Sequence, residues 1–227
     1  MKILVISDIH SNFHALRAVI EKADNCDAIL CAGDITGYGA FPVECIHQAR
    51  VMEWKTVAGN HDAAISTKDT DWFNDEARDA IRINREMIKT NDLMWLAGIP
   101  QSLTLNLGIT KITIFHGSPT EPLTSYVFPN DMENYAHLYL GHTESDLIIL
   151  GHTHIPHIVY RPEGVVLNPG SVGQPRDGDP RASFAIVNLP ELKVEIRRIE
   201  YDIDAAAEAI RDSGIPERFA KRLYQGL

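Results

Sequence analysis

Five short apolar runs in this sequence are each followed at once by polar residues of the kinds that bind metal ions. The runs are Ile3–Ile6, Ile29–Cys31, Thr56–Ala58, Ile112–Phe115 and Leu147–Leu150. Short runs rich in β-branched residues are typical of buried strands. In open α/β sheets, ligands bind beyond the carboxyl ends of the strands. The pattern therefore predicts an α/β fold in which these polar residues meet at one edge.

The residues that follow the runs carry side chains that hold divalent metal ions in proteins. In chain order they are Asp8-Ile9-His10, Gly33-Asp34, Gly59-Asn60-His61-Asp62, His116-Gly117 and Gly151-His152-Thr153-His154. Carboxylate, amide oxygen and imidazole together suit Mn, Fe, Zn, Co or Ni. The absence of cysteine from the set argues against a purely structural zinc site.

The set holds too many ligands for one ion, so we expect a dinuclear centre. The first ion would be held by Asp8, His10, Asp34 and His154. The second would be held by Asn60, His116 and His152, with Asp34 as the bridge between the two ions. Pairs of metal ions about 3.5–4 Å apart recur in enzymes that catalyse displacement at phosphorus.

The order of these motifs resembles the calcineurin-like metallophosphoesterase superfamily. The match runs from Asp8 to His154 and continues through residues 168–178, Asn-Pro-Gly-Ser-Val-Gly-Gln-Pro-Arg-Asp-Gly. That stretch, together with residues 7–12 and 33–39, is similar to the small, single-domain prokaryotic phosphodiesterase branch. The resemblance implies two packed mixed β-sheets, a β-sandwich, flanked by helices in a four-layer fold.

One departure from the superfamily bears on the substrate. The protein-phosphatase branch reads Gly-Asp-x-x-Asp-Arg-Gly after its second strand, whereas this sequence reads Gly33-Asp34-Ile35-Thr36-Gly37-Tyr38. Gly37 replaces the aspartate that pairs with the catalytic histidine in that branch, and Tyr38 replaces the phosphate-binding arginine. The departure argues against phosphoprotein dephosphorylation and leaves open which group orients His61.

The expected function is that of a dinuclear metal-dependent phosphoesterase, of the phosphodiesterase or nucleotide pyrophosphohydrolase type. We expect two divalent transition-metal ions as cofactors. Manganese is the first choice, and Fe, Ni, Co or Zn are the alternatives. The two ions would lower the pKa of a bridging water. The resulting hydroxide would attack phosphorus in line, without a phosphoenzyme. The alternatives are a phosphomonoesterase of nucleotides or small metabolites, and a non-catalytic, metal-stabilised scaffold that the full ligand set disfavours.

Five further residues are candidates for catalysis or substrate binding. His61 would protonate the leaving oxygen or bind a phosphoryl oxygen in the transition state. Asp62 would either orient His61 or hold the turn through hydrogen bonds. Arg176 would bind a second phosphate, because guanidinium groups match phosphate oxygens, or would be a solvated surface arginine. Asn12 would cap a helix or contact substrate, and Tyr38 would stack on a base or only pack.

The other histidines and the large aromatic residues are expected to be structural. His142 lies in a Gly-His-Thr-Glu sequence that imitates the last motif, but it precedes the predicted strand over 146–150 and should lie at the opposite sheet edge. Trp72, Phe73 and Trp95 are expected to pack helices. The remaining histidines without a predicted site role are His14, His47, His137 and His157.

Hydrophobic periodicity and turn residues place the remaining elements. Apolar residues at helical spacing predict helices over Phe13–Ala23, Val43–Met52, Trp72–Lys89, Asn91–Ala97 and, with a break at Gly214 and Pro216, over 203–224. Turn residues predict hairpins around residues 107–109, 162–164 and 190. Loops 118–130 and 170–180 directly follow motif residues and are candidates for determining specificity.

Composition limits the remaining possibilities. The 227 residues, 44% of them hydrophobic, are expected to form one metallophosphoesterase domain over 1–227 with the C-terminal helices packed on it. A formal net charge of −10 opposes stable nucleic-acid binding. Cys26, Cys31 and Cys45 have no metal-binding spacing and are expected to be free thiols. No run approaches the roughly 20 apolar residues of a membrane span, so we expect a cytoplasmic location. The expected partner is a small phosphoester or nucleotide substrate. Homo-oligomerisation is left open.

Overall fold

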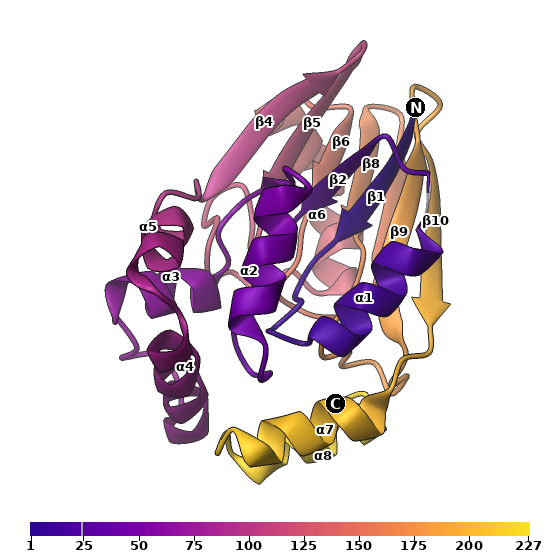
Figure 1. Ribbon diagram of the computed structural model, residues 1–227. Helices are drawn as coiled ribbons and strands as arrows, with labels where there is room; N and C mark the ends of the chain where they lie inside the picture. The colour runs from indigo at the N-terminus through magenta and orange to yellow at the C-terminus, as the bar shows by residue number, and fades with distance from the viewer. Residues whose placement is uncertain (24) are drawn as a thin grey trace.

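Two five-stranded sheets form the centre of the structure, a computed structural model that describes residues 1–23 and 25–227 (Figure 1). The first sheet has the order β10 (Lys193–Ile199), β9 (Ala182–Asn188), β1 (Lys2–Ile6), β2 (Ala28–Cys31) and β3 (Lys55–Thr56). The second has the order β4 (Ser102–Leu107), β5 (Thr110–Phe115), β6 (Leu147–Ile149), β8 (Gly164–Asn168) and β7 (His157–Arg161). The three predicted hairpins are β4–β5, β7–β8 and β9–β10.

Both sheets are mixed, as predicted. β1, β2 and β3 run parallel in the first sheet, and β5, β6 and β8 run parallel in the second. An antiparallel strand, β9, lies beside β1 at one side of the first parallel set, and antiparallel strands β4 and β7 lie at the two sides of the second. Parallel strands direct their carboxyl ends to the same edge, so this topology places the residues that follow them close together.

The alternation of side chains along β1 shows how the layers pack. Ile3 and Val5 lie in the core between the two sheets, where they meet Ile112 of β5 and Leu147 of β6. The intervening Leu4 belongs to the core on the opposite face of the first sheet. Both faces of the strand are therefore buried, which explains its continuous apolar sequence.

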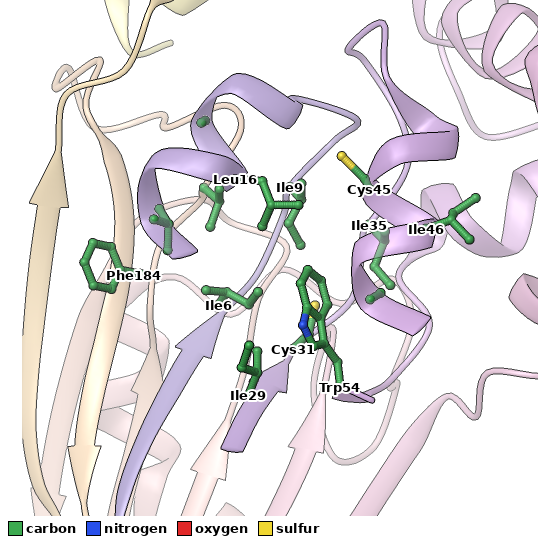
Figure 2. Close-up of a cluster of buried hydrophobic side chains, with 14 of the residues drawn as sticks. Ile6, Ile9, Leu16, Ile29, Cys31, Ile35, Cys45, Ile46, Trp54 and Phe184 are labelled. Carbon is green, nitrogen blue, oxygen red and sulfur yellow. The ribbon is translucent and has the colours of Figure 1, made fainter. Parts of the chain in front are cut away.

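Helices cover the outer faces of both sheets (Figure 1). On the first sheet, α1 (Phe13–Lys22) and α2 (Pro42–Val51) contribute Leu16 and Ile46 to a core that also holds Phe184 of β9 (Figure 2). On the second sheet, α6 (Pro129–Thr143) packs Met132, Ala136 and Leu140 against Ile148. The order helix, sheet, sheet, helix confirms the predicted four-layer fold, although α6 itself was not predicted.

The remaining helices lie beside the carboxyl edge of the strands. They are α3 (Asn60–Thr67), α4 (Asp75–Met87), α5 (Thr90–Ala97), α7 (Ile203–Asp212) and α8 (Glu217–Gln225). The two C-terminal helices form a hairpin whose Ile210, Phe219 and Leu223 pack with Ala77 and Ala80 of α4. Within the described ranges, no helix combines the length and hydropathy needed to cross a bilayer.

Candidate metal centre and active-site pocket

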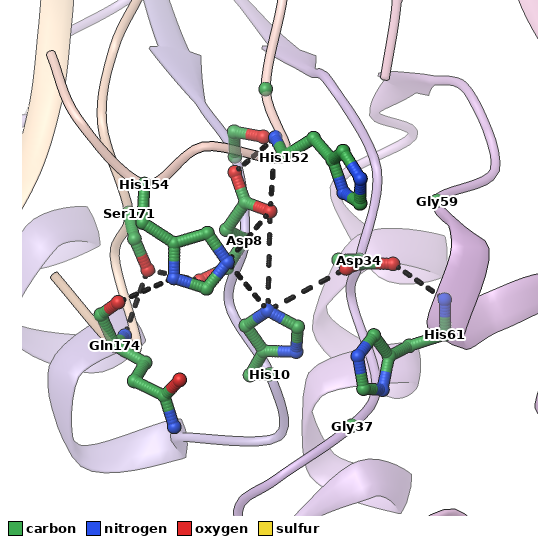
Figure 3. A network of polar contacts seen from close by, with 12 residues as sticks. Asp8, His10, Asp34, Gly37, Gly59, His61, His152, His154, Ser171 and Gln174 are labelled. Carbon is green, nitrogen blue, oxygen red and sulfur yellow. Dashed lines mark hydrogen bonds and ion pairs between the residues drawn. The ribbon is translucent and has the colours of Figure 1, made fainter. Parts of the chain in front are cut away.

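The five predicted motifs meet where the strands end. Figure 3 shows residues of four of them, namely Asp8 and His10, Asp34, Gly59 and His61, and His152 and His154. Asp8 follows β1, Asp34 follows β2 and Asn60 opens α3 shortly after β3. His116 follows β5 and His152 follows β6, so both sheets contribute to the centre. Groups with facing ligand atoms are Asp8, His10 and His154; His10, Asp34 and His61; and Asp34, His116 and His152.

The first set of proposed ligands converges on a small volume. Nε2 of His10 lies 3.0 Å from Nε2 of His154 and 3.5 Å from Oδ2 of Asp34. Nε2 of His154 lies 3.3 Å from Oδ1 of Asp8. All four residues are buried. The structure thus brings together the four residues expected for the first ion.

The second set converges in the same way. Nε2 of His116 lies 3.0 Å from Oδ1 of Asn60 and 3.0 Å from Nδ1 of His152. The same His116 atom lies 3.4 Å from Oδ2 of Asp34. Oδ2 of Asp34 therefore faces both sets, which is the arrangement required of a bridging ligand.

Backbone carbonyls fix which nitrogen of each imidazole carries the proton. Nδ1 of His116 bonds to Ala32 O at 2.7 Å, and Nε2 of His152 bonds to Thr124 O at 3.1 Å. A carbonyl only accepts hydrogen bonds, so these nitrogens donate. In the neutral rings, the lone pairs on Nε2 of His116 and Nδ1 of His152 then face each other at 3.0 Å. Such pairs repel unless a cation lies between them, and a carbonyl behind each ring is usual for metal-bound histidine.

The charges in the centre also fit a bound cation. Burial alone would raise the pKa of Asp34, but neighbouring His116, His61 and His10 hold it well below its usual range. Burial alone would lower the pKa of His116, but the Asp34 carboxylate raises it to about 9. The buried carboxylates therefore require positive charge nearby, supplied by a proton or by a metal ion. The donor set of oxygen and imidazole nitrogen fits divalent transition metals.

The backbone at the centre is strained. Five of the proposed ligands have left-handed backbone conformations; they are Asp8 (φ 54°), His10 (φ 47°), Asp34 (φ 52°), His152 (φ 68°) and His154 (φ 62°). Such conformations cost non-glycine residues about 1–3 kcal/mol each and cluster at functional sites. The fold holds these side chains inward at the expense of local backbone energy.

His61 is held by ring packing and not by a carboxylate. Its ring makes edge-on contacts with His10 at 4.8 Å, Tyr38 at 4.4 Å and Phe73 at 4.8 Å between centroids. Its backbone N–H donates to Oδ1 of Asp34 at 2.9 Å. Burial lowers the pKa of His61 to about 4. Among the described residues, its Nδ1 has no hydrogen-bond partner.

Gly37 makes this packing possible. A Cβ at this position would lie 2.3 Å from Nδ1 of His10 and 3.2 Å from Nδ1 of His61. Its φ of 148° is also unfavourable for residues with a side chain. Any larger residue, including the aspartate of the protein-phosphatase branch, would therefore displace His10 or His61 in this protein.

Of the two roles expected for Asp62, the structure shows the hydrogen-bonding one. Its carboxylate accepts from the backbone N–H of Ile35 at 3.1 Å, of Thr36 at 2.9 Å and of Gly59 at 3.2 Å. It also accepts from the Thr36 hydroxyl at 2.7 Å. Asp62 thus joins the Asp34 loop to the start of α3 and positions the backbone that carries the ligands.

A pocket of about 180 Å³ opens beside the centre. Its lining includes Asp34, His61 and His152 together with Tyr38 and Arg176. Tyr38 and Arg176 therefore both lie at the pocket, and their contacts with substrate stay a prediction. Arg176 is half-buried and not a solvated surface residue, and its Nε has no partner among the described residues.

Asn12 serves as the predicted helix cap. Its Oδ1 accepts from Ala15 N at 3.1 Å, and its Nδ2 donates to Gly173 O at 2.9 Å. The residue is buried and lies outside the lining of the pocket. The structure therefore gives Asn12 a structural role and no contact with the pocket.

Four other aromatic and histidine residues were expected to be structural, and the structure contradicts this for one of them, Trp72. Trp95 packs against the helical core, as predicted. The prediction for Trp72 was wrong, because α4 begins only at Asp75 and the indole lines the pocket with 57% of its surface exposed. His142 is exposed in the last turn of α6, and His157 pairs with Glu133 at 3.0 Å.

Several contributors to the site were not predicted. Thr124 and Tyr126 come from the 118–130 loop, and Tyr126 stacks on His152 with 3.9 Å between centroids. Gln174 O accepts from Nδ1 of His154. Phe219 of α8 stacks on Tyr38 with 4.4 Å between centroids. The two loops had been marked as candidates for specificity, but no sequence signal identified Phe219.

Comparisons with known proteins agree with this geometry. A model of the calcineurin-like phosphoesterase superfamily domain matches residues 1–191. An uncharacterised protein of Methanocaldococcus jannaschii is 38% identical over 246 residues, which cover 99% of this chain and 98% of that protein. The crystal structure of a Sphaerobacter thermophilus metallophosphoesterase is 34% identical with a TM-score of 0.86, covering 100% of this chain and 99% of that one.

A hypothetical protein of Pyrococcus horikoshii OT3 shares the fold with a TM-score of 0.91 at 24% identity, covering 100% of this chain and 98% of that one. The superfamily depends on divalent metals, and the facing histidine and aspartate groups described above can hold them. The chain therefore belongs to the calcineurin-like phosphoesterase superfamily and is a phosphoester hydrolase.

Proposed function

We propose that this protein hydrolyses phosphodiesters or nucleotide anhydrides with two divalent metal ions. The observation that carries the proposal is the position of Asp34, whose Oδ2 lies 3.5 Å from Nε2 of His10 and 3.4 Å from Nε2 of His116. One carboxylate oxygen thus faces two separate sets of ligand atoms. The first ion would be held by Asp8, His10, Asp34 and His154, and the second by Asp34, Asn60, His116 and His152.

The protein supplies the ligands and the surroundings for this chemistry. When bound, two divalent ions neutralise charge on phosphoryl oxygens and lower the pKa of a water molecule. Manganese is our first choice, because the set mixes carboxylate and amide oxygens with imidazole; Fe, Ni, Co and Zn suit it too. His61 lines the pocket beside Asp34 and would donate a hydrogen bond to a phosphoryl oxygen or a proton to the leaving oxygen.

The charge distribution of the pocket supports a diester or anhydride over a phosphoprotein. Tyr38 stands where a phosphate-binding arginine would stand in a protein phosphatase, so the pocket lacks that fixed cation. Arg176 is the arginine in the pocket lining. Its guanidinium lies 6.0 Å from the centre of the Tyr38 ring, and its charge reaches His10, His61 and His154. It is well placed to bind a second phosphate or a non-bridging oxygen.

A phosphomonoesterase is the second candidate, and Arg176 is also the observation that favours it. A dianionic monoester gains more than a monoanionic diester from a nearby cation, because Coulomb attraction scales with charge. A non-catalytic scaffold is disfavoured, since the ligand sets, His61 and the pocket are all present. A scaffold would not need the strained backbone that holds five ligands inward.

The test is hydrolysis of bis-p-nitrophenyl phosphate by protein reconstituted separately with Mn, Ni, Co, Fe, Mg and Zn. We expect activity with Mn and Ni that disappears in Asp34→Asn. Asp71→Asn, a change at an exposed aspartate outside the pocket, is the matched control and should behave like the wild type. The proposal fails if the wild type hydrolyses the diester with none of these metals.

A further inference from the structure

Two series of ring-to-ring contacts start at histidines of the candidate metal centre, and each ends at an exposed aromatic ring. In the first, His61 packs on Phe73 at 4.8 Å, and Phe73 contacts Trp72 at 6.2 Å between centroids. In the second, His152 stacks on Tyr126 at 3.9 Å, and Tyr126 lies nearly parallel to Phe128 at 5.8 Å. The two series come from segments far apart in sequence and line one pocket through Trp72, Phe73 and Tyr126.

The outer rings of both series are unusually open to solvent. Trp72 exposes 57% of its surface, Tyr126 52% and Phe128 45%. Tryptophan and tyrosine usually bury most of their surface in a folded protein. Exposed aromatic residues such as Trp72 and Tyr126 in the lining of one pocket therefore indicate a place where a planar apolar group binds.

The pocket lining combines two kinds of chemistry. Asp34, Asn60 and the histidines suit a phosphoryl group and its metals. Trp72 and Tyr126 suit a flat ring. Arg176 adds a cation for further phosphate oxygens. A molecule that matches this lining has a phosphoryl group attached to a planar aromatic group.

The pocket lining also includes polar residues, Asn74 and Thr124. Oδ1 of Asn74 caps α4 by accepting from Ala77 N at 2.9 Å, and the same amide carries an NH₂ group that can donate. Amide and hydroxyl groups in the lining can hydrogen-bond to the edge of a nucleobase, whereas a plain phenyl ring offers them no partner.

Resting on the proposed function, we propose that Trp72 and Tyr126 form a nucleobase subsite, so that the physiological substrate is a nucleoside phosphodiester or anhydride. Stacking on aromatic side chains tolerates every base, because each base has a π-face. The subsite would therefore select nucleosides over aliphatic groups without strong preference for one base. Specificity would lie in the rings of Trp72 and Tyr126 and not in the metal centre.

The decisive comparison uses two substrates that share the same leaving group, p-nitrophenolate. Thymidine 5′-(p-nitrophenyl phosphate) and methyl p-nitrophenyl phosphate differ only in the nucleoside. We expect the wild type to prefer the first by tenfold or more in kcat/KM. Trp72→Ala should lower that preference about tenfold, mainly through KM. Tyr135→Ala removes a ring of α6 with 47% exposure outside the pocket, and this control should keep the wild-type preference.

A binding measurement separates this inference from the catalytic proposal. Isothermal titration of the Mn-loaded protein should show adenosine monophosphate binding at least tenfold tighter than ribose 5-phosphate, and Trp72→Ala should remove most of the difference. Equal affinities for the two ligands, or a difference that survives Trp72→Ala, would overturn the subsite even if diesters are hydrolysed. Loss of diester hydrolysis with every metal would overturn the proposed reaction, while the titration would still decide the subsite.

Discussion

The ring of Tyr38 stacks on the ring of Phe219, with 4.4 Å between centroids and 23° between planes. Tyr38 also contacts His61 at 4.4 Å and His10 at 4.6 Å. The C-terminal helix α8 is thus connected to the candidate centre by ring contacts. Because the family model ends at residue 191, this support comes from a part of the chain outside the matched domain.

Removing the Phe219 ring should therefore impair the site from a distance. Phe219→Ala should lower the free energy of unfolding by about 3–5 kcal/mol, as expected for a buried phenylalanine. Phe219→Leu should retain most of the burial but lose the stacking on Tyr38, and it should lower kcat by up to about 10²-fold through misplacement of His61. Urea denaturation and steady-state kinetics check the two parts.

Tyr38→Phe is the matched control for this prediction, since it keeps the ring and removes only the hydroxyl. It should retain a near-normal kcat. If Phe219→Leu were also to keep the wild-type kcat, the C-terminal hairpin would stabilise the fold without positioning His61.

His61 should affect the rate more than metal binding. We expect His61→Ala to keep the metal content of the wild type and to reduce kcat by ~10²–10⁴, the usual range for general acid–base catalysis. The loss should be smaller for p-nitrophenyl esters, whose leaving group needs little protonation. Kinetics with a series of leaving groups would check this, and an equal loss throughout the series would instead indicate stabilisation of charge on phosphoryl oxygens.

Asp62 should contribute more to the stability of the fold than to catalysis. Asp62→Ala leaves the N–H groups of Ile35, Thr36 and Gly59 without their acceptor in a buried turn. Each unsatisfied buried donor costs about 1–3 kcal/mol, so the free energy of unfolding should fall by about 3 kcal/mol or more. Thermal and urea denaturation measure the change. A variant as stable as the wild type would mean that these bonds are replaced by water.

Most of the fold, and the convergence of the proposed ligands, could be predicted from sequence for a physical reason. Strands such as β1 are buried on both faces and therefore have continuous apolar sequences, and the proposed ligands follow such runs. Two helices were missed. α3 begins within the ligand motif itself, and its signal is short: Gly59 at the N-cap with Asp62 three residues later. α6 carries Pro129 at its first turn, inside the loop expected over 118–130, and most of the helix lies in a stretch for which the sequence predicts no element.

The remaining features of the site depend on contacts that sequence patterns do not encode. The carbonyls of Ala32, Thr124 and Gln174 orient three histidines, but every residue has a carbonyl, so the residue type gives no signal. Phe219 reaches Tyr38 only because the C-terminal hairpin packs on α4. Such long-range packing is visible only in three dimensions.

Arg176 should set the preference between substrate charges. We expect a higher kcat/KM for bis-p-nitrophenyl phosphate than for p-nitrophenyl phosphate with Mn or Ni, because the pocket has no fixed arginine at position 38. Arg176→Gln should reduce kcat/KM for the dianionic monoester more than for the diester. Parallel kinetics on the two substrates measure both effects. A monoester preference of tenfold or more would replace the phosphodiesterase proposal with the phosphomonoesterase alternative.

Asp34 is proposed to join two metal sites, and metal counting tests this bridging role most directly. Elemental analysis of reconstituted, gel-filtered protein should give close to two ions per chain in the wild type. Asn60→Ala, a ligand of one proposed site, should retain about one ion, whereas Asp34→Asn should lose both. At most one ion in the wild type, or loss of only one ion in Asp34→Asn, would contradict the account.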